Sequence, residues 1–143
     1  MKHFKFKNVV GLALTLCLTL AVMIPTAFAA ALPLNTGSYN WTISDWMLPI
    51  KHEWNGKDAG QTWILGAGNY EWYLYVNGSI PSSLRADLRK VVPLGGDQTV
   101  ISNNGAAVNP MYFSVNGSAV TYYAVVSVTQ SEGASGTTSV YSS

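Results

Sequence analysis

The feature that most constrains the fold is the alternation of apolar and polar residues in short runs beyond residue 30. Runs rich in aromatic and β-branched residues are separated by Gly, Asn, Ser and Pro, which is the pattern of short antiparallel strands joined by turns. The stretch YEWYLYV, residues 70–76, is the clearest example, and we expect one of its two faces to be buried. That face carries Tyr70, Trp72, Leu74 and Val76, and the other carries Glu71, Tyr73 and Tyr75.

Residues 1–29 have the composition of an export signal. Three lysines precede an apolar run over residues 9–24, and Ala27-Phe28-Ala29 forms the small-x-small pattern that signal peptidase accepts. We therefore expect cleavage after Ala29 and a secreted, extracellular protein. A retained membrane anchor is the weaker alternative, because the apolar run is short for a span and ends at a proline. The lysine-rich start also suits a bacterial exported protein.

The only cysteine, Cys17, lies within the export signal, so no disulfide is expected in residues 30–143. The domain must instead be stabilised by a hydrophobic core, for which a chain of this length is sufficient. The whole chain has a formal net charge of +1, and removal of the signal lysines makes the remainder slightly acidic. Basic residues cluster only at Arg85, Arg89 and Lys90, so nucleic acid is not an expected partner.

The strongest turn signal is Asn116-Gly117, which separates two apolar runs. Asn-Gly favours a type I′ turn, in which both central residues adopt positive φ, and such turns join the two strands of a hairpin. A two-residue loop would pair Phe113 with Val120 and keep the apolar residues on one face. The sequence therefore predicts a β-hairpin here, with Asn116 and Gly117 as structural residues.

Two segments depart from the strand pattern. In the stretch PSSLRADLRKVV, Leu84, Leu88 and Val91 recur at helical spacing, which predicts a two-turn helix that ends before Pro93. Residues 130–143 are dominated by Ser, Gly and Thr, so we expect a mobile tail or an irregular edge.

These patterns predict one all-β domain over residues 30–129, an antiparallel β-sandwich of about seven strands with one short helix. A small β-barrel is the alternative. The stretch LGAGNYEW resembles the corner of Ig-like and fibronectin-like domains, and this resemblance implies an Ig-like architecture. The resemblance also implies that the Tyr70 hydroxyl bonds to backbone a few residues upstream. The Cys…Trp…Cys spacing of immunoglobulin domains is absent, so only the architecture is implied.

The second face of the 70–76 strand supplies the first candidate binding residues. Tyr73 and Tyr75 beside Glu71 form a rigid amphipathic strip of the kind that stacks on sugar rings or anchors an interface. The alternative role is structural, with the two tyrosines paired across strands with Tyr112 or Tyr123 to cover the sheet.

All five tryptophans lie between residues 41 and 72. A domain of this size needs about one or two in its core, because Trp is large and its indole N–H needs a partner when buried. Trp46 and Trp54 lie in a loop-like stretch rich in charged residues, DWMLPIKHEWNGKD, and are expected to be exposed. Aromatic rings among carboxylates and amides suit carbohydrate, although the same composition fits a protein interface or contact with a membrane surface.

The sequence contains no recognisable catalytic motif. His52 is the only histidine beyond the signal, and HEWNG lacks the second histidine of a zinc-binding HExxH motif. Carboxylates for glycoside hydrolysis remain conceivable at Asp45, Glu53 and Glu71, although a catalytic cleft usually needs a larger scaffold. The aspartates are not spaced as calcium ligands, so neither a metal nor a cofactor is expected.

The sequence therefore favours a secreted, non-catalytic binding protein that engages polysaccharide or cell-envelope glycan through exposed aromatic residues. Two alternatives from other classes stay open: a membrane-active, bacteriocin-like toxin, and a self-assembling matrix protein built on valine-rich strands such as AVVSVT. An inhibitor of an extracellular enzyme is also open, and no oligomeric state is indicated. The candidate binding residues are Trp46, Trp54, Glu71, Tyr73 and Tyr75, and the structural ones are Tyr70, Trp72, Asn116 and Gly117.

Overall fold

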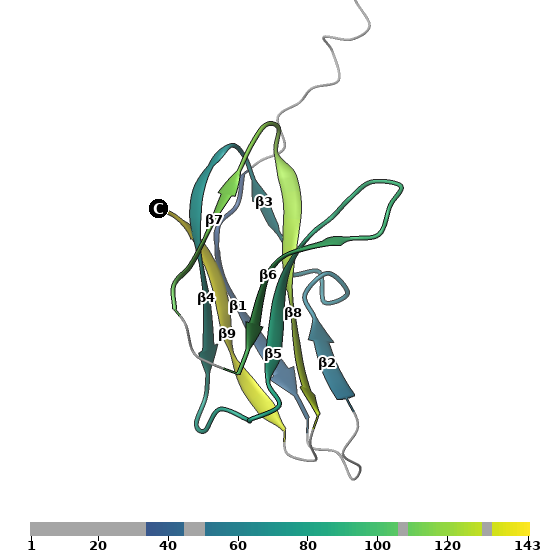
Figure 1. Ribbon diagram of the computed structural model, residues 1–143, viewed down its shortest axis with the longest axis vertical. Coiled ribbons are helices and arrows are strands. Elements are labelled where there is room, and N and C mark those ends of the chain that lie inside the picture. The colour runs from purple at the N-terminus through teal and green to yellow at the C-terminus, as the bar shows by residue number, and fades with distance from the viewer. Residues whose placement is uncertain (1–33, 45–50, 106–108, 130–132) are drawn as a thin grey trace, which may run out of the picture. The chain divides into compact units, whose positions relative to one another are not determined.

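The computed structural model of the chain describes residues 34–44, 51–105, 109–129 and 133–143. Within these ranges, nine strands form two antiparallel sheets around one core (Figure 1). The four-stranded sheet has the order β1 (Gly37–Ile43), β9 (Ala134–Ser142), β4 (Gly68–Val76), β7 (Met111–Val115). The five-stranded sheet has the order β2 (Lys51–Asn55), β8 (Val120–Thr129), β5 (Arg85–Lys90), β6 (Gln98–Asn104), and β3 (Trp63–Leu65) also pairs with β8. The predicted export signal and Trp46 lie outside the described residues.

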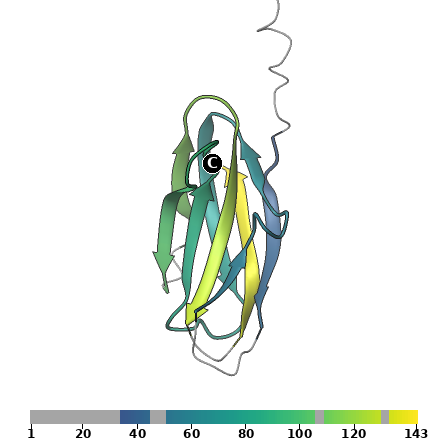
Figure 2. The ribbon, with the colours of Figure 1, turned by 90° about the vertical axis from the view of Figure 1, so that its right-hand side faces the viewer.

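The strands pair in one nested pattern. β1 pairs with β9, β2 and β3 with β8, β4 with β7, and β5 with β6, so the chain runs as one long hairpin whose tip is the β5–β6 connection. Because successive pairs alternate between the two sheets, the hairpin is rolled into a jelly roll (Figure 2). The expected antiparallel β-sandwich is confirmed. Its strand order is that of a jelly roll and not of an Ig domain, and its two sheets do not close into the alternative barrel.

The helix predicted in residues 82–92 is wrong, because this segment contains β5. Strand β5 is hydrogen-bonded to β8 on one side and to β6 on the other. Leu84 and Leu88 are four residues apart, a spacing that fits a strand as well as a helix, and Ala86 between them is also buried. None of the described residues belongs to a helix, and correspondingly none belongs to a helix long and apolar enough to cross a membrane.

The predicted hairpin at Asn116-Gly117 is also wrong. Strand β7 pairs with β4 and β8 pairs with strands of the other sheet, so the segment between them crosses from one sheet to the other. Gly117 has a φ of +91°, but Asn116 does not share the positive φ that a type I′ turn requires of both central residues. Phe113 and Tyr122 do both face the core, but from opposite sheets, with ring centroids 5.7 Å apart.

Tyr70 forms the corner that its sequence context implies. Its Oη donates to the Gly66 carbonyl oxygen, four residues upstream, at 3.0 Å. Its ring stacks on Phe113 of the neighbouring strand β7, with centroids 5.6 Å apart. This hydrogen bond fixes the start of β4, the strand that carries three of the candidate binding residues.

Three tryptophans fill the core, which is more than expected. Trp41, Trp63 and Trp72 are each at most 1% exposed. Trp72 Nε1 donates to Thr138 Oγ1 at 2.7 Å, and Trp63 Nε1 donates to the Gly37 carbonyl oxygen at 3.0 Å. A sandwich presents two inner faces, and large rings fill the space between them where the residues of the adjacent strand are small.

Residues 134–142 supply those small residues, so the expectation of a mobile tail or irregular edge is wrong. They form β9, the strand between β1 and β4. Gly136 lies opposite Trp41 in the register with β1, and Thr138 accepts the indole hydrogen bond from Trp72. The Gly- and Thr-rich composition that suggested disorder is therefore what lets two tryptophans pack against this strand.

Replacing Gly136 by alanine should destabilise the fold severely. A Cβ at this position would overlap the carbonyl oxygen of Tyr75 and lie 2.7 Å from Cζ2 of Trp41. We expect Gly136→Ala to lower the free energy of unfolding by about 3 kcal/mol, because neither the backbone nor a fully buried ring can move aside cheaply. Urea denaturation followed by circular dichroism measures the loss.

Gly96→Ala is the matched control, since a Cβ there meets no atom within 4 Å. We expect this control to change the free energy of unfolding by no more than about 0.5 kcal/mol. Equal losses in the two variants would contradict the role of Gly136.

Candidate functional site

The outer surface of the four-stranded sheet carries a group of tyrosines around one carboxylate. In the register of the sheet, Glu71 of β4 lies opposite Tyr112 of β7 on one side and opposite Tyr141 of β9 on the other. Directly opposed residues of antiparallel strands point to the same face, and so do residues two apart on one strand. Tyr73 and Tyr75 therefore share this face. We call this set the tyrosine face: Glu71, Tyr73, Tyr75, Tyr112 and Tyr141.

The rings of the tyrosine face are exposed and yet held in place by one another. Tyr75, Tyr112 and Tyr141 are 52%, 67% and 46% exposed, and Tyr73 is half-buried between its neighbours. The Tyr73 and Tyr75 rings stack with centroids 5.9 Å apart and planes 8° from parallel. Tyr141 meets Tyr73 edge-on at 6.0 Å and 67°. The arrangement is an aromatic platform on the outer surface of the sheet, open to solvent.

Hydrogen bonds between side chains position the platform. Tyr73 Oη donates to Glu71 Oε2 at 2.6 Å. Tyr141 Oη and Ser38 Oγ lie 2.9 Å apart, and Ser38 Oγ lies 2.8 Å from Ser139 Oγ. Polar side chains of β1 and β9 therefore continue the face beyond the rings and offer further donors and acceptors.

The contact with Glu71 changes the acidity of Tyr73. The pKa of Tyr73 is raised to about 12, chiefly by the hydrogen bond to Glu71, with smaller contributions from lost hydration and from the negative charge of Glu71. Tyr73 consequently remains a protonated donor throughout the physiological range. One carboxylate oxygen of Glu71 accepts this bond, and the other is left to accept from a ligand hydroxyl.

Sequence reasoning identified three residues of the tyrosine face as candidates and missed the other two. Glu71, Tyr73 and Tyr75 come from a single alternating strand and are found together as expected. Tyr112 was considered only as a cross-strand partner, and Tyr141 lies in the segment expected to be mobile. Tyr123, the other suggested partner, lies on the five-stranded sheet. Only the strand register brings β7 and β9 beside β4.

The tryptophan candidates do not contribute to this face. Trp46 lies outside the described residues. Trp54 does not lie in an exposed loop as expected, because it belongs to β2 and pairs with Val126 of β8, a fully buried residue. Its side chain is half-buried and packs against the core. In the part of the chain that the structure covers, no group of three or more His, Cys, Asp or Glu could hold a metal ion.

Neither a protein-family model nor a curated protein sequence matches this chain. Two solved structures resemble it in fold. The Yersinia pseudotuberculosis-derived mitogen is 14% identical, with a TM-score of 0.50 over 78% of this chain and 88% of that one. TmCBM61, solved in complex with beta-1,4-galactotriose, is 13% identical, with a TM-score of 0.39 over 74% of this chain and 70% of that one. At this identity the likeness to the mitogen shows the fold alone, and the weaker likeness to TmCBM61 supports no conclusion.

Replacing Glu71 by glutamine should return the Tyr73 pKa toward its ordinary value of 10.0. The neutral amide removes both the charge and the strong acceptor that keep the phenol protonated. In the wild type we expect Tyr73 to stay protonated through about pH 11, whereas in Glu71→Gln it should titrate at a lower pH. Tyrosine Cζ chemical shifts in ¹³C NMR follow each phenol separately. Glu53→Gln, on the other sheet, is the control and should leave Tyr73 unchanged; an unchanged Tyr73 in Glu71→Gln would contradict the assignment.

Proposed function

We propose that the protein is a non-catalytic glycan-binding protein that acts outside the cell and holds polysaccharide against the tyrosine face. The observation that carries this proposal is that Tyr75 and Tyr141 are about half exposed and both contact Tyr73, which Glu71 holds by a hydrogen bond. Tyr112, which lies opposite Glu71 in the register, is more exposed still. Exposed rings that are held in one arrangement are suited to stacking against a ligand.

Such a platform matches the chemistry of sugars. The apolar C–H face of a pyranose ring packs against an aromatic ring, and its hydroxyls need donors and acceptors at the edge of that contact. Rings that are already stacked lose little rotamer freedom on binding, which lowers the entropic cost. An open face suits an extended polysaccharide better than a small ligand, which would need a concave pocket.

We propose a non-catalytic role because of the positions of the carboxylates. Glycoside hydrolysis requires two carboxyl groups that flank one bond, at most about 10 Å apart. Glu71 lies on the outer face of the four-stranded sheet and Glu53 lies on β2 in the five-stranded sheet, so these two cannot flank a common substrate. Asp45, the remaining carboxylate considered, lies outside the described residues.

The pairing of strand β8 speaks against the self-assembly alternative. The valine-rich segment AVVSVT lies in β8, which is paired with β2 and β3 on one side and β5 on the other. A strand paired on both sides offers no free edge to a second chain.

Binding to insoluble polysaccharide tests the proposed function. We expect the protein to be retained on at least one of three supports: bacterial cell wall, chitin and cellulose. Tyr75→Ala and Tyr141→Ala should each weaken retention about tenfold, the effect of losing roughly 1.4 kcal/mol of ring contact. Depletion isotherms over a range of protein concentrations give the affinity.

Leu94→Ser is the control, because Leu94 is a fully exposed apolar residue in the β5–β6 connection, outside the tyrosine face. It should bind as the wild type does. Absence of retention on every support would refute the proposal. Dye release from lipid vesicles would then favour the membrane-active alternative, and concentration-dependent fibres would favour the matrix alternative.

A further inference from the structure

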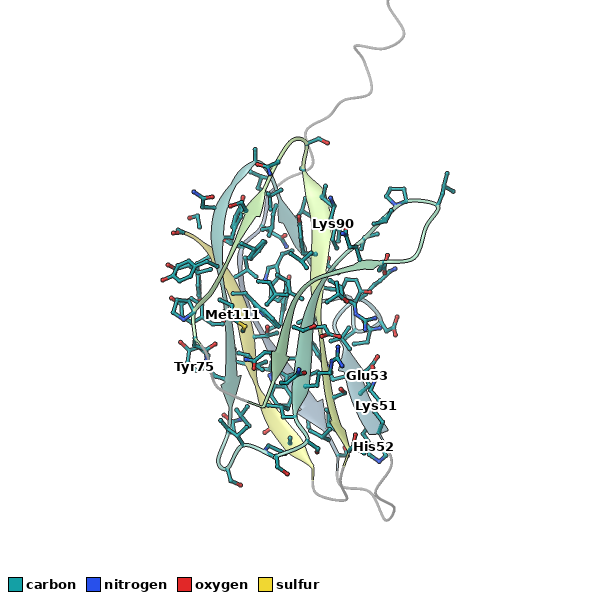
Figure 3. The ribbon with its side chains drawn as sticks, in the orientation of Figure 1. Lys51, His52, Glu53, Tyr75, Lys90 and Met111 are labelled. Carbon is teal, nitrogen blue, oxygen red and sulfur yellow. The ribbon has the colours of Figure 1, made fainter. Side chains whose placement is uncertain are left out.

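The five-stranded sheet carries a second, chemically different site on its outer surface. A groove of about 470 Å³ lies over β2, β8 and β5. Figure 3 shows Lys51 and Glu53 on β2, on the side of the molecule away from Tyr75. The groove is independent of the tyrosine face, and its polar lining includes Lys51, Glu53, Arg85, Asp87, Arg89 and Ser127.

The alternation of β5 places two arginines and one aspartate in this groove. Asp87 accepts from Ser102 Oγ at 2.6 Å, from Arg89 Nη2 at 3.3 Å and from Arg85 Nε at 3.4 Å. Burial alone would raise the pKa of Asp87, but these donors outweigh burial and hold the pKa below its usual range. Asp87 is therefore an ionised carboxylate whose oxygens are already shared among three partners.

The charges of the groove do not cancel. Lys51 pairs with Glu53 at 2.8 Å, and Asp87 faces both arginines, so three cations face two carboxylates. The Arg85 side chain is 56% exposed, and its one hydrogen bond to a side chain of the described ranges is the long bond from Nε to Asp87. Its two terminal guanidinium nitrogens make no hydrogen bond to any of the described residues. These two nitrogens are the donors that bind a carboxylate or a sulfate.

Ser127 contributes a hydroxyl to the lining of the groove. Ser127 of β8 lies opposite Arg85 on one side and opposite Glu53 on the other. The residue is only 6% exposed and lines the groove together with both of these neighbours. A serine hydroxyl in this position can donate to a ligand oxygen.

We infer that this groove binds an anionic oxygen group, a carboxylate or a sulfate, with the Arg85 guanidinium and the Lys51 ammonium facing its charge and the Ser127 hydroxyl donating to one of its oxygens. Arginine matches such groups through two parallel N–H donors. The group can belong to an acidic sugar chain or to a free inorganic anion, and the two sources share this chemistry.

Isothermal titration calorimetry on the full chain separates these sources. The probes are trigalacturonate, its fully methyl-esterified form and sodium sulfate, all at one low ionic strength. We expect trigalacturonate to bind and its uncharged ester to bind at least tenfold more weakly, and added salt to weaken the charged ligand because surface charges are screened. Binding of sulfate without trigalacturonate would assign the groove to a free anion.

Three variants locate the binding. Arg85→Gln should weaken the charged probe at least tenfold, and Ser127→Ala should weaken it measurably without any change of charge. Lys90→Gln is the matched control, because Lys90 lies on the same strand and carries the same charge but does not line the groove. Amide NMR spectra show whether each variant keeps the fold.

Equal losses in Arg85→Gln and Lys90→Gln would overturn the inference, because they would indicate diffuse attraction instead of a site. Equal binding of the acid and its ester, or no binding of any probe, would also overturn it. Tyr75→Ala should bind the charged probe as the wild type does, so failure of the tyrosine face and failure of this groove are distinguishable.

Discussion

The close approach of two tryptophans to the small residues of β9 is the contact on which the rest of the structure depends. Trp41 lies over Gly136, and the Trp72 indole donates to Thr138. These contacts hold β1 and β4 against the two sides of one strand. Because side chains alternate along a strand, fixing Gly136 and Thr138 inward also fixes Tyr141 outward, in line with the tyrosines of β4.

Side chains alternate between the inner and the outer face along every strand, but the two outer surfaces of the sandwich differ in chemistry. The four-stranded sheet presents stacked phenols and hydroxyls, whereas the five-stranded sheet presents ion pairs. Beyond the charged groove, Asp97 accepts from Lys57 Nζ at 2.7 Å and from Tyr123 Oη at 2.8 Å. The bond from Lys57 is the main reason that the pKa of Asp97 is lowered, so this link between the β2–β3 and β5–β6 connections stays charged.

Alternation within single strands was enough to predict a sandwich and the buried and outward faces of β4, and the resemblance of LGAGNYEW to the Ig-like corner implied the hydrogen bond of Tyr70. Alternation failed to predict the structure where one sequence pattern is compatible with two structures. The four-residue spacing of Leu84 and Leu88 fits both a strand and a helix, and apolar runs on either side of Asn116 fit both a hairpin and a crossing between sheets. Tyr112, Tyr141 and the Arg85–Ser127 pair could not be predicted, because only the register between distant strands creates them.

The nested pairing of the strands has a consequence for how the chain acquires its structure. Strand β9 is ninth in chain order but lies between the first and the fourth, so the four-stranded sheet cannot form until residue 142 is available. Contacts of such long sequence separation close slowly, because the entropy of a large loop is lost before any pairing compensates for it. A ribosome-bound chain that ends before residue 134 therefore lacks the strand that organises its core, and the four-stranded sheet can form only after these residues have been synthesised.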